Sequence, residues 1–142
     1  MDALCRMART FAPLAGRILI TFIFLRSGFG KIVEFSAVAQ GMTNKGMPLA
    51  ELLLVGAIVF QIAGGLMVLF GWKARWGALL LILFMIPATL IYHDFWNLEG
   101  QQYARQLTHF VKNLSILGGL LLLMGMGSGP LSFDKMKEPA RS

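Results

Sequence analysis

Both histidines of the chain lie in one polar stretch, from His93 to Asn113, which separates two long apolar runs. Asp94 adjoins the first histidine, and Lys112 closely follows the second, His109. Imidazole titrates near neutral pH, so these side chains could carry protons as well as donate hydrogen bonds. The combination indicates a site for polar chemistry in a chain whose other segments are mostly apolar.

The spacing of these residues predicts that they meet at one level. His93 ends one predicted helix, while His109 and Lys112 share a face near the start of the next. Because consecutive helices joined by a short loop pack as antiparallel neighbours, the two faces should come together, with Lys31 at the same depth. The start of the later helix also points its unpaired N–H groups there, which favours an anionic or carbonyl-bearing ligand. The predicted ligand-binding residues are Arg26, Lys31, His93, Asp94, Trp96, His109, Lys112 and Asn113.

Several other chemistries find no support in the sequence. It contains no phosphate-binding loop, dinucleotide fingerprint, nucleophile elbow or zinc signature. Haem ligation by His93 and His109, or metal ligation by these two residues and Asp94, lacks any diagnostic spacing. A single cysteine, Cys5, excludes an intrachain disulfide and any cysteine-only cluster. We therefore expect no metal site.

The composition is that of a membrane protein. Of 142 residues, 56% are hydrophobic and 14% are charged, against about 25% charged residues in a typical soluble chain. A soluble domain of this size could not cover so much apolar surface with polar groups, so lipid must cover it. The formal net charge of +6 does not indicate a nucleic-acid partner, because the distribution of the basic residues along the chain fits the orientation of a membrane protein.

Four apolar runs are long enough to cross a bilayer. They predict an all-α fold, an integral membrane four-helix bundle that forms a single domain over residues 1–142. The helices are expected at about 13–33, 49–71, 75–93 and 107–126, followed by a charged tail over 131–142.

The distribution of lysine and arginine predicts the orientation. If the N-terminus is inside, that side carries eight of the thirteen basic residues, including those of the Lys73–Arg75 turn. The opposite side carries four at most, and Arg26 lies within the first span. The positive-inside rule then places both the N-terminus and the C-terminus in the cytoplasm. The stretch with the two histidines would face outward across the inner membrane of the cell.

Small and polar residues within the spans predict contacts between helices. Small residues let two helices approach closely, and an amide can hydrogen-bond across such a contact. Arg26 lies deep in its span, where an unpaired charge is costly, so we expect a partner such as Glu51 or Asp94. The predicted packing residues are Gln61, Gly64, Gly65, Gly118 and Gly119.

Four segments give the sequence a family resemblance. They are G-R-I-L-I-T-F-I-F-L-R-S-G-F-G-K (16–31), Q-I-A-G-G-L-M-V-L-F-G (61–71), H-D-F-W (93–96) and H-F-V-K-N-L-S-I-L-G-G-L-L-L (109–122). In order and spacing they resemble the DoxX family of small membrane proteins, over roughly residues 16–134. The resemblance implies a four-helix inner-membrane bundle, and relatives include the membrane subunit of an archaeal thiosulfate:quinone oxidoreductase. The family often has a glutamate where this chain has Gln61, and an amide cannot relay protons as a carboxylate does.

Three functions are compatible with the sequence. The favoured hypothesis is a redox-associated subunit in the lipid bilayer that binds quinone, or another lipophilic compound, at its outer side. A redox protein or another copy of the chain would then be its protein partner. The alternative is a structural or partner-assembly subunit without chemistry of its own, in which the polar cluster fixes helix packing. A small-anion carrier that uses the basic residues ranks third.

Overall fold

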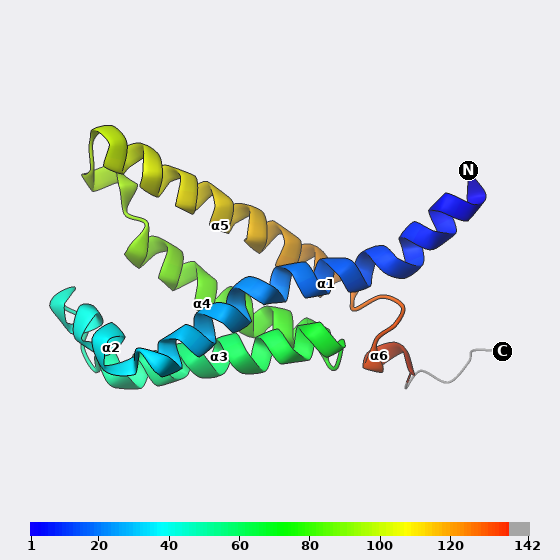
Figure 1. Ribbon diagram of the computed structural model, residues 1–142, viewed down its shortest axis with the longest axis horizontal. Helices are drawn as coiled ribbons and strands as arrows, with labels where there is room; N and C mark the ends of the chain where they lie inside the picture. The colour runs from blue at the N-terminus through cyan, green and yellow to red at the C-terminus, as the bar shows by residue number, and fades with distance from the viewer. Residues whose placement is uncertain (137–142) are drawn as a thin grey trace.

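The computed structural model describes residues 1–136 and is entirely helical between its turns over that range. Four of its helices are long and apolar enough to cross a membrane, which confirms the predicted all-α membrane fold. In chain order (Figure 1) the elements are α1 (Asp2–Val33), α2 (Phe35–Asn44), α3 (Ala50–Phe70), α4 (Ala74–Tyr92), the short turn η1 (Phe95–Asn97), α5 (Gly100–Met126) and α6 (Phe133–Met136).

Two of the long helices begin earlier than the predicted spans. Helix α1 begins at Asp2 and not near residue 13, and α5 begins at Gly100 and not near residue 107. Both additional segments contain mostly good helix formers such as Ala, Leu, Met, Gln and Arg. Hydropathy locates only the most apolar part of a helix, so these less apolar extensions of α1 and α5 are not predicted by it.

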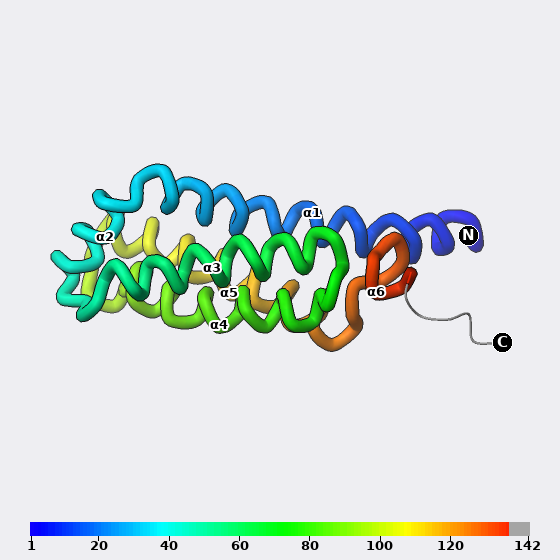
Figure 2. Tube along the Cα trace, turned by 90° about the horizontal axis from the view of Figure 1, so that it is seen from below, coloured from blue at the N-terminus to red at the C-terminus, as the bar shows by residue number. Residues whose placement is uncertain are grey.

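The long helices pack in the order α1, α3, α4, α5, with α3 between α1 and α4, and α4 between α3 and α5. Helices α1 and α5 approach each other near Ile20 and Gly119, where an added Cβ on the glycine would lie 3.0 Å from Ile20 Cδ1. Beyond that crossing the two helices diverge toward the end that carries α2, as Figure 1 shows. Figure 2 shows α2 at one end of the fold and the N-terminus and α6 at the other. The fold is therefore an incomplete ring of helices, open along one side.

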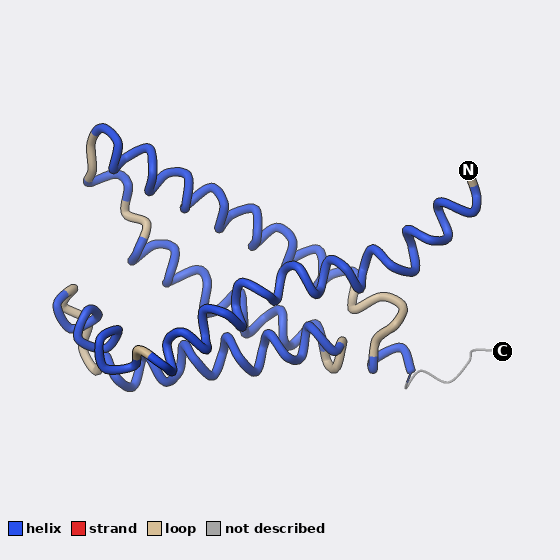
Figure 3. Tube along the Cα trace, in the orientation of Figure 1, coloured by secondary structure: helices blue, strands red, loops and turns tan. Residues whose placement is uncertain are grey.

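The two ends of the fold differ. We call the end with α2 and η1 the outer end, following the orientation that the charge distribution predicts. The N-terminus and α6 lie at the opposite, inner end (Figure 3), as an even number of spans requires. The orientation of the whole molecule across the membrane remains a prediction.

Glycines bring α3 close to its neighbours. A Cβ on Gly64 would lie 2.9 Å from the carbonyl oxygen of Gly77 on α4, and a Cβ on Gly65 would lie 2.8 Å from Leu25 on α1. Both residues therefore lie at close helix contacts, as expected. Gly118 does not, because a Cβ there would meet no atom within 4 Å among the described residues. An apolar cluster fills the space between the helices; its buried members are Phe24, Val68, Ala78, Leu81, Ile82, Met85 and Leu120.

A folded C-terminal segment covers the inner end, where the sequence predicted a tail. We call residues 127–136 the C-terminal strap. The Arg17 guanidinium, 1% exposed, donates from Nη2 to the Leu131 carbonyl at 2.7 Å. The Asp134 carboxylate accepts hydrogen bonds from the backbone N–H groups of Lys73 (2.7 Å) and Ala74 (3.0 Å) at the start of α4. The prediction of a tail was therefore wrong for residues 131–136, and residues 137–142 lie outside the described range.

Candidate ligand-binding site

A cavity of about 800 Å³ lies in the outer half of the fold, between α1, α3 and α4. Most of its wall is apolar or aromatic, formed by residues that include Phe24, Val38, Met42, Leu54, Phe84, Met85 and Tyr92. Its polar lining residues are Arg26, Ser27, Lys31, Glu34, Gln61, His93 and Asn113. An apolar chamber with a few convergent polar groups is typical of sites for small organic ligands.

Lys31 reaches from α1 into this cavity. Its Nζ donates a hydrogen bond to Ser27 Oγ at 2.6 Å and lies 5.7 Å from the ring centroid of Phe84 on α4. An ammonium group has three donors, so these contacts leave hydrogens available. It forms no ion pair with a carboxylate in residues 1–136. Lys31 is therefore placed to donate to an oxygen atom of a ligand.

Gln61, from α3, forms the deep wall of the cavity. Its side chain is 1% exposed, and its Oε1 has no hydrogen-bond partner in the described chain. The residue does pack where α1 and α3 meet, since a Cβ on Gly28 would lie 3.3 Å from Gln61 Cβ. The expected interhelical hydrogen bond through its oxygen does not form. A buried oxygen without a donor costs about 1–3 kcal/mol, which a ligand hydroxyl could recover.

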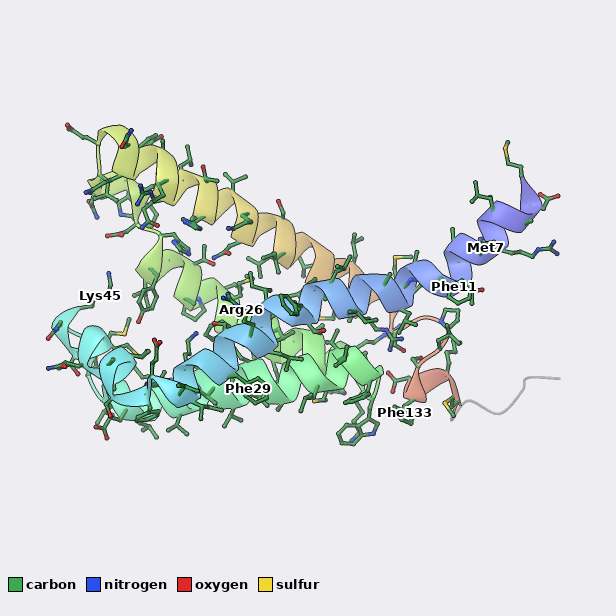
Figure 4. All side chains as sticks on the ribbon, viewed as in Figure 1. Met7, Phe11, Arg26, Phe29, Lys45 and Phe133 are labelled. Atoms are coloured by element: carbon green, nitrogen blue, oxygen red, sulfur yellow. The ribbon has the colours of Figure 1, made fainter. Side chains whose placement is uncertain are left out.

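Arg26 lies on the side of α1 that borders the gap toward α5 (Figure 4). It is exposed, as are the other lining residues on that side, Ile23 and Gly30. All three belong to the membrane span, so the cavity opens sideways toward lipid. The expected ion pair with Glu51 or Asp94 does not form, because α1 directs Arg26 into the gap and both carboxylates lie at the outer end.

Hydrogen bonds at the outer rim tie α4 to α5. His93 Nδ1 lies 2.8 Å from Gln106 Oε1, and Asn113 Nδ2 donates to Thr89 Oγ1 at 3.0 Å. Since an amide oxygen can only accept, Nδ1 carries the hydrogen in this arrangement, and in the neutral ring Nε2 is then the acceptor. Thr89 and His93, four residues apart at the end of α4, thus hold α4 and α5 together.

The two histidine rings stack on each other. The ring centroids of His93 and His109 are 5.3 Å apart, and the ring planes differ by 14°. Rings stacked face to face cannot point their nitrogens at one iron atom from opposite sides, as a haem with two axial histidines requires. Within residues 1–136, no three His, Cys, Asp or Glu side chains gather around a common point.

The structure divides the predicted ligand-binding residues into two groups. Those that line the cavity are Arg26, Lys31, His93 and Asn113. Those that lie outside its lining are Asp94, Trp96, His109 and Lys112. Residues 94–97 turn away from the end of α4 into η1, where Trp96 is 53% exposed beside Phe95. Lys112 adjoins Asn113 in the sequence but is rotated about 100° from it on α5, so it faces outward.

Sequence comparison settles the family. The sequence model of the DoxX family matches residues 12–94, which include α3, α4 and all but the first turns of α1. The chain belongs to the DoxX family. The match ends before α5, so the DoxX model covers three of the four membrane helices described here.

Full-length relatives extend this assignment. The inner membrane protein YphA of Escherichia coli is 31% identical over 128 residues, which cover 90% of this chain and 91% of that protein. The inner membrane protein YqjF of the same organism is 36% identical over 123 residues, or 87% of this chain and 89% of its own. A Surfeit locus protein 4 homolog of Schizosaccharomyces pombe is 30% identical over 132 residues, only 39% of its length. No solved structure matches this DoxX protein significantly.

Some lining residues of this DoxX protein were not predicted as ligand-binding. Gln61 is a predicted helix-packing residue, and Phe84 and Tyr92 are not among the predicted site residues. Ser27 and Glu34 lie four before and three after Lys31, so the face of α1 that carries the lysine was a usable signal. Nothing in the sequence marked Gln61 of α3 as a cavity residue, because the sequence does not show whether a glutamine oxygen has a hydrogen-bond donor.

Proposed function

We propose that this protein binds a membrane-soluble organic molecule with carbonyl or hydroxyl oxygens, of the quinone type, in the cavity of its outer half. The observation that carries the proposal is that Lys31 and Gln61 both line one largely apolar cavity, and that neither has all its hydrogen-bonding capacity used in residues 1–136. The Lys31 ammonium has hydrogens that form no bond within residues 1–136, and Gln61 Oε1 is an acceptor without a donor there. A ligand with oxygens at both ends of a ring would satisfy both.

The apolar walls fit the body of such a ligand. The rings of Phe24 and Phe84 meet edge to face, with centroids 6.4 Å apart, and Phe84 also lies beneath the Lys31 ammonium. An aromatic ring inserted beside them would gain dispersion and quadrupole contacts. Nε2 of His93 forms no hydrogen bond within residues 1–136, so it could bond to a ligand hydroxyl.

The route of entry supports a lipophilic ligand. The Lys45 ammonium (labelled in Figure 4) reaches from the end of α2 to the ring of the lining residue Tyr92 on α4, 5.3 Å from its centroid, at the outer end of the fold. The side bordered by Ile23 and Arg26 stays open. A ligand dissolved in the membrane would enter from there, and Arg26 would meet its polar oxygens.

We place the protein in the inner membrane as part of the same proposal. YphA and YqjF are both named inner membrane proteins, and the basic residues here favour cytoplasmic termini. The redox role is then to hold a reducible compound beside a partner enzyme. An anion carrier is less well supported, because apolar side chains and the C-terminal strap fill the inner end.

Lys31→Met tests the proposal. Purified protein in lipid nanodiscs should bind decylubiquinone, and the variant should bind it about tenfold or more weakly, because a hydrogen bond to a charged donor contributes about 1.5–3 kcal/mol. Binding is read from ligand-induced thermal stabilisation and from mass spectrometry of bound lipophiles.

The matched control is Lys112→Met, which removes the same charge from α5 outside the cavity and should bind like the unaltered protein. Absence of saturable quinone binding by the unaltered protein would refute the proposed function. Equal weakening by both lysine variants would instead indicate a general charge effect.

A further inference from the structure

The N-terminal part of α1 is too long to be part of the membrane span. Helix α1 has 32 residues, which at 1.5 Å per residue is about 48 Å, against a hydrocarbon core of about 30 Å. Residues 14–33 are enough to cross that core. The preceding turns must lie outside it, and Figure 1 shows them extending beyond the other helices at the inner end.

These outlying turns have two distinct faces. At 100° per residue, Leu4, Met7 and Phe11 fall within about 60° of one another. Arg6 and Arg9 also fall within about 60° of each other, on nearly the opposite side. The three apolar side chains are 70%, 59% and 57% exposed, so no described part of the chain covers them. Met7 and Phe11 lie clear of the other helices in Figure 4.

A proline separates this segment from the span. Pro13 lies inside α1 and lacks the N–H that would bond to the carbonyl of Arg9, which weakens the helix at that point. The C-terminal strap packs beside Pro13, since a Cβ on Gly129 would lie 2.5 Å from Pro13 Cβ. The strap thus contacts the base of the segment, where the helix lacks one backbone hydrogen bond.

We propose that residues 2–12 form an amphipathic helix that lies on the membrane surface at the inner end and binds acidic phospholipid headgroups. The span that follows holds this segment at the bilayer boundary, so lipid is the apolar phase within its reach. Leu4, Met7 and Phe11 enter the boundary between headgroups and acyl chains, and the two arginines face the phosphates. Lys73 and Arg75, in the turn at the same end, add to the positive charge that favours an anionic surface.

The single cysteine makes the proposal measurable in the intact protein. Cys5 is exposed and lies on the arginine side of the segment. A nitroxide attached to it should stay accessible to a water-soluble paramagnetic reagent. The same label at Met7→Cys, in a Cys5→Ser background, should instead be accessible to oxygen and shielded from that reagent, as expected within the membrane boundary.

The lipid composition of the vesicles tests the role of charge. Vesicles that contain phosphatidylglycerol should increase the immersion of the Met7→Cys label relative to phosphatidylcholine alone. Adding Arg6→Gln and Arg9→Gln should reduce the ratio of docked to undocked segment about thirtyfold in the anionic vesicles, and little in neutral ones. Phe11→Met in the same background is the control, because it keeps both charges and an apolar face.

Two results would overturn the proposal. Equal water accessibility at positions 5 and 7 in anionic vesicles would show that the segment stays in solution. Shielding of position 7 from both reagents in detergent as well as in lipid would show that protein, such as another copy of the chain, covers the apolar face.

Discussion

Gln61 illustrates how one buried side chain can oppose stability and favour binding. Its oxygen has lost water without gaining a donor, in a wall that is otherwise packed tightly against α1. Lys31 has the opposite need, because its ammonium contacts only the Ser27 hydroxyl and the Phe84 ring and still has hydrogens to donate. Both residues are incompletely satisfied in the isolated chain, and the cavity lies beside both. Such residues mark a site because packing alone does not explain them.

Gln61→Met tests this balance. Methionine has a similar shape but needs no hydrogen-bond donor, so the ligand-free variant should be more stable by about 1 kcal/mol or more. Thermal unfolding of delipidated samples in detergent measures this gain. The extra stabilisation caused by added quinone should shrink at the same time. A ligand-free variant that is less stable than the unaltered protein would mean that the oxygen has a partner after all, such as a bound water.

At the scale of elements, the C-terminal strap joins parts of the chain that are far apart in sequence. The Arg17–Leu131 hydrogen bond spans 114 positions, and Asp134 supplies the cap that α4 lacks locally, since its N-cap residue Lys73 offers no side-chain acceptor. The backbone also adopts a left-handed conformation at Leu131, with φ 57°. A non-glycine residue in that region costs free energy, which the contacts around the strap must offset.

Asp134→Asn should loosen the strap. The variant loses the negative charge at the start of α4 and one of the two acceptor oxygens, which should lower stability by about 1 kcal/mol. Limited proteolysis of the strap in nanodiscs should accelerate accordingly. Asp94→Asn is the matched control, because Asp94 occupies the N-cap of η1 without a side-chain capping bond. Equal proteolysis of the two variants would contradict the capping role.

At the scale of the whole molecule, the features that could be predicted from the sequence are those that depend on the composition of a single segment. Apolar runs located the four spans, and small residues located the α3 contacts at Gly64 and Gly65. The gap between α1 and α5 could not be predicted, because it depends on the angle at which the two helices diverge beyond their contact at Ile20. The contacts of the C-terminal strap could not be predicted either, since its partners Arg17 and Lys73 are distant from it in sequence. Of the eight predicted ligand-binding residues, four line the cavity and four lie outside its lining, because the direction of a side chain at a helix end depends on how the loop after α4 turns.

The open side between α1 and α5 has a consequence for how any occupant would be titrated. A molecule that arrives through lipid is present at a mole fraction of the bilayer, and its total amount per volume of buffer does not set the occupancy of the cavity. At fixed protein and fixed total quinone, adding empty vesicles should therefore empty the site by two-dimensional dilution. Measuring saturation at several lipid-to-protein ratios checks this: the curves should coincide when plotted against ligand per lipid. Curves that coincide only against aqueous concentration would point to entry past Lys45 and Tyr92 instead.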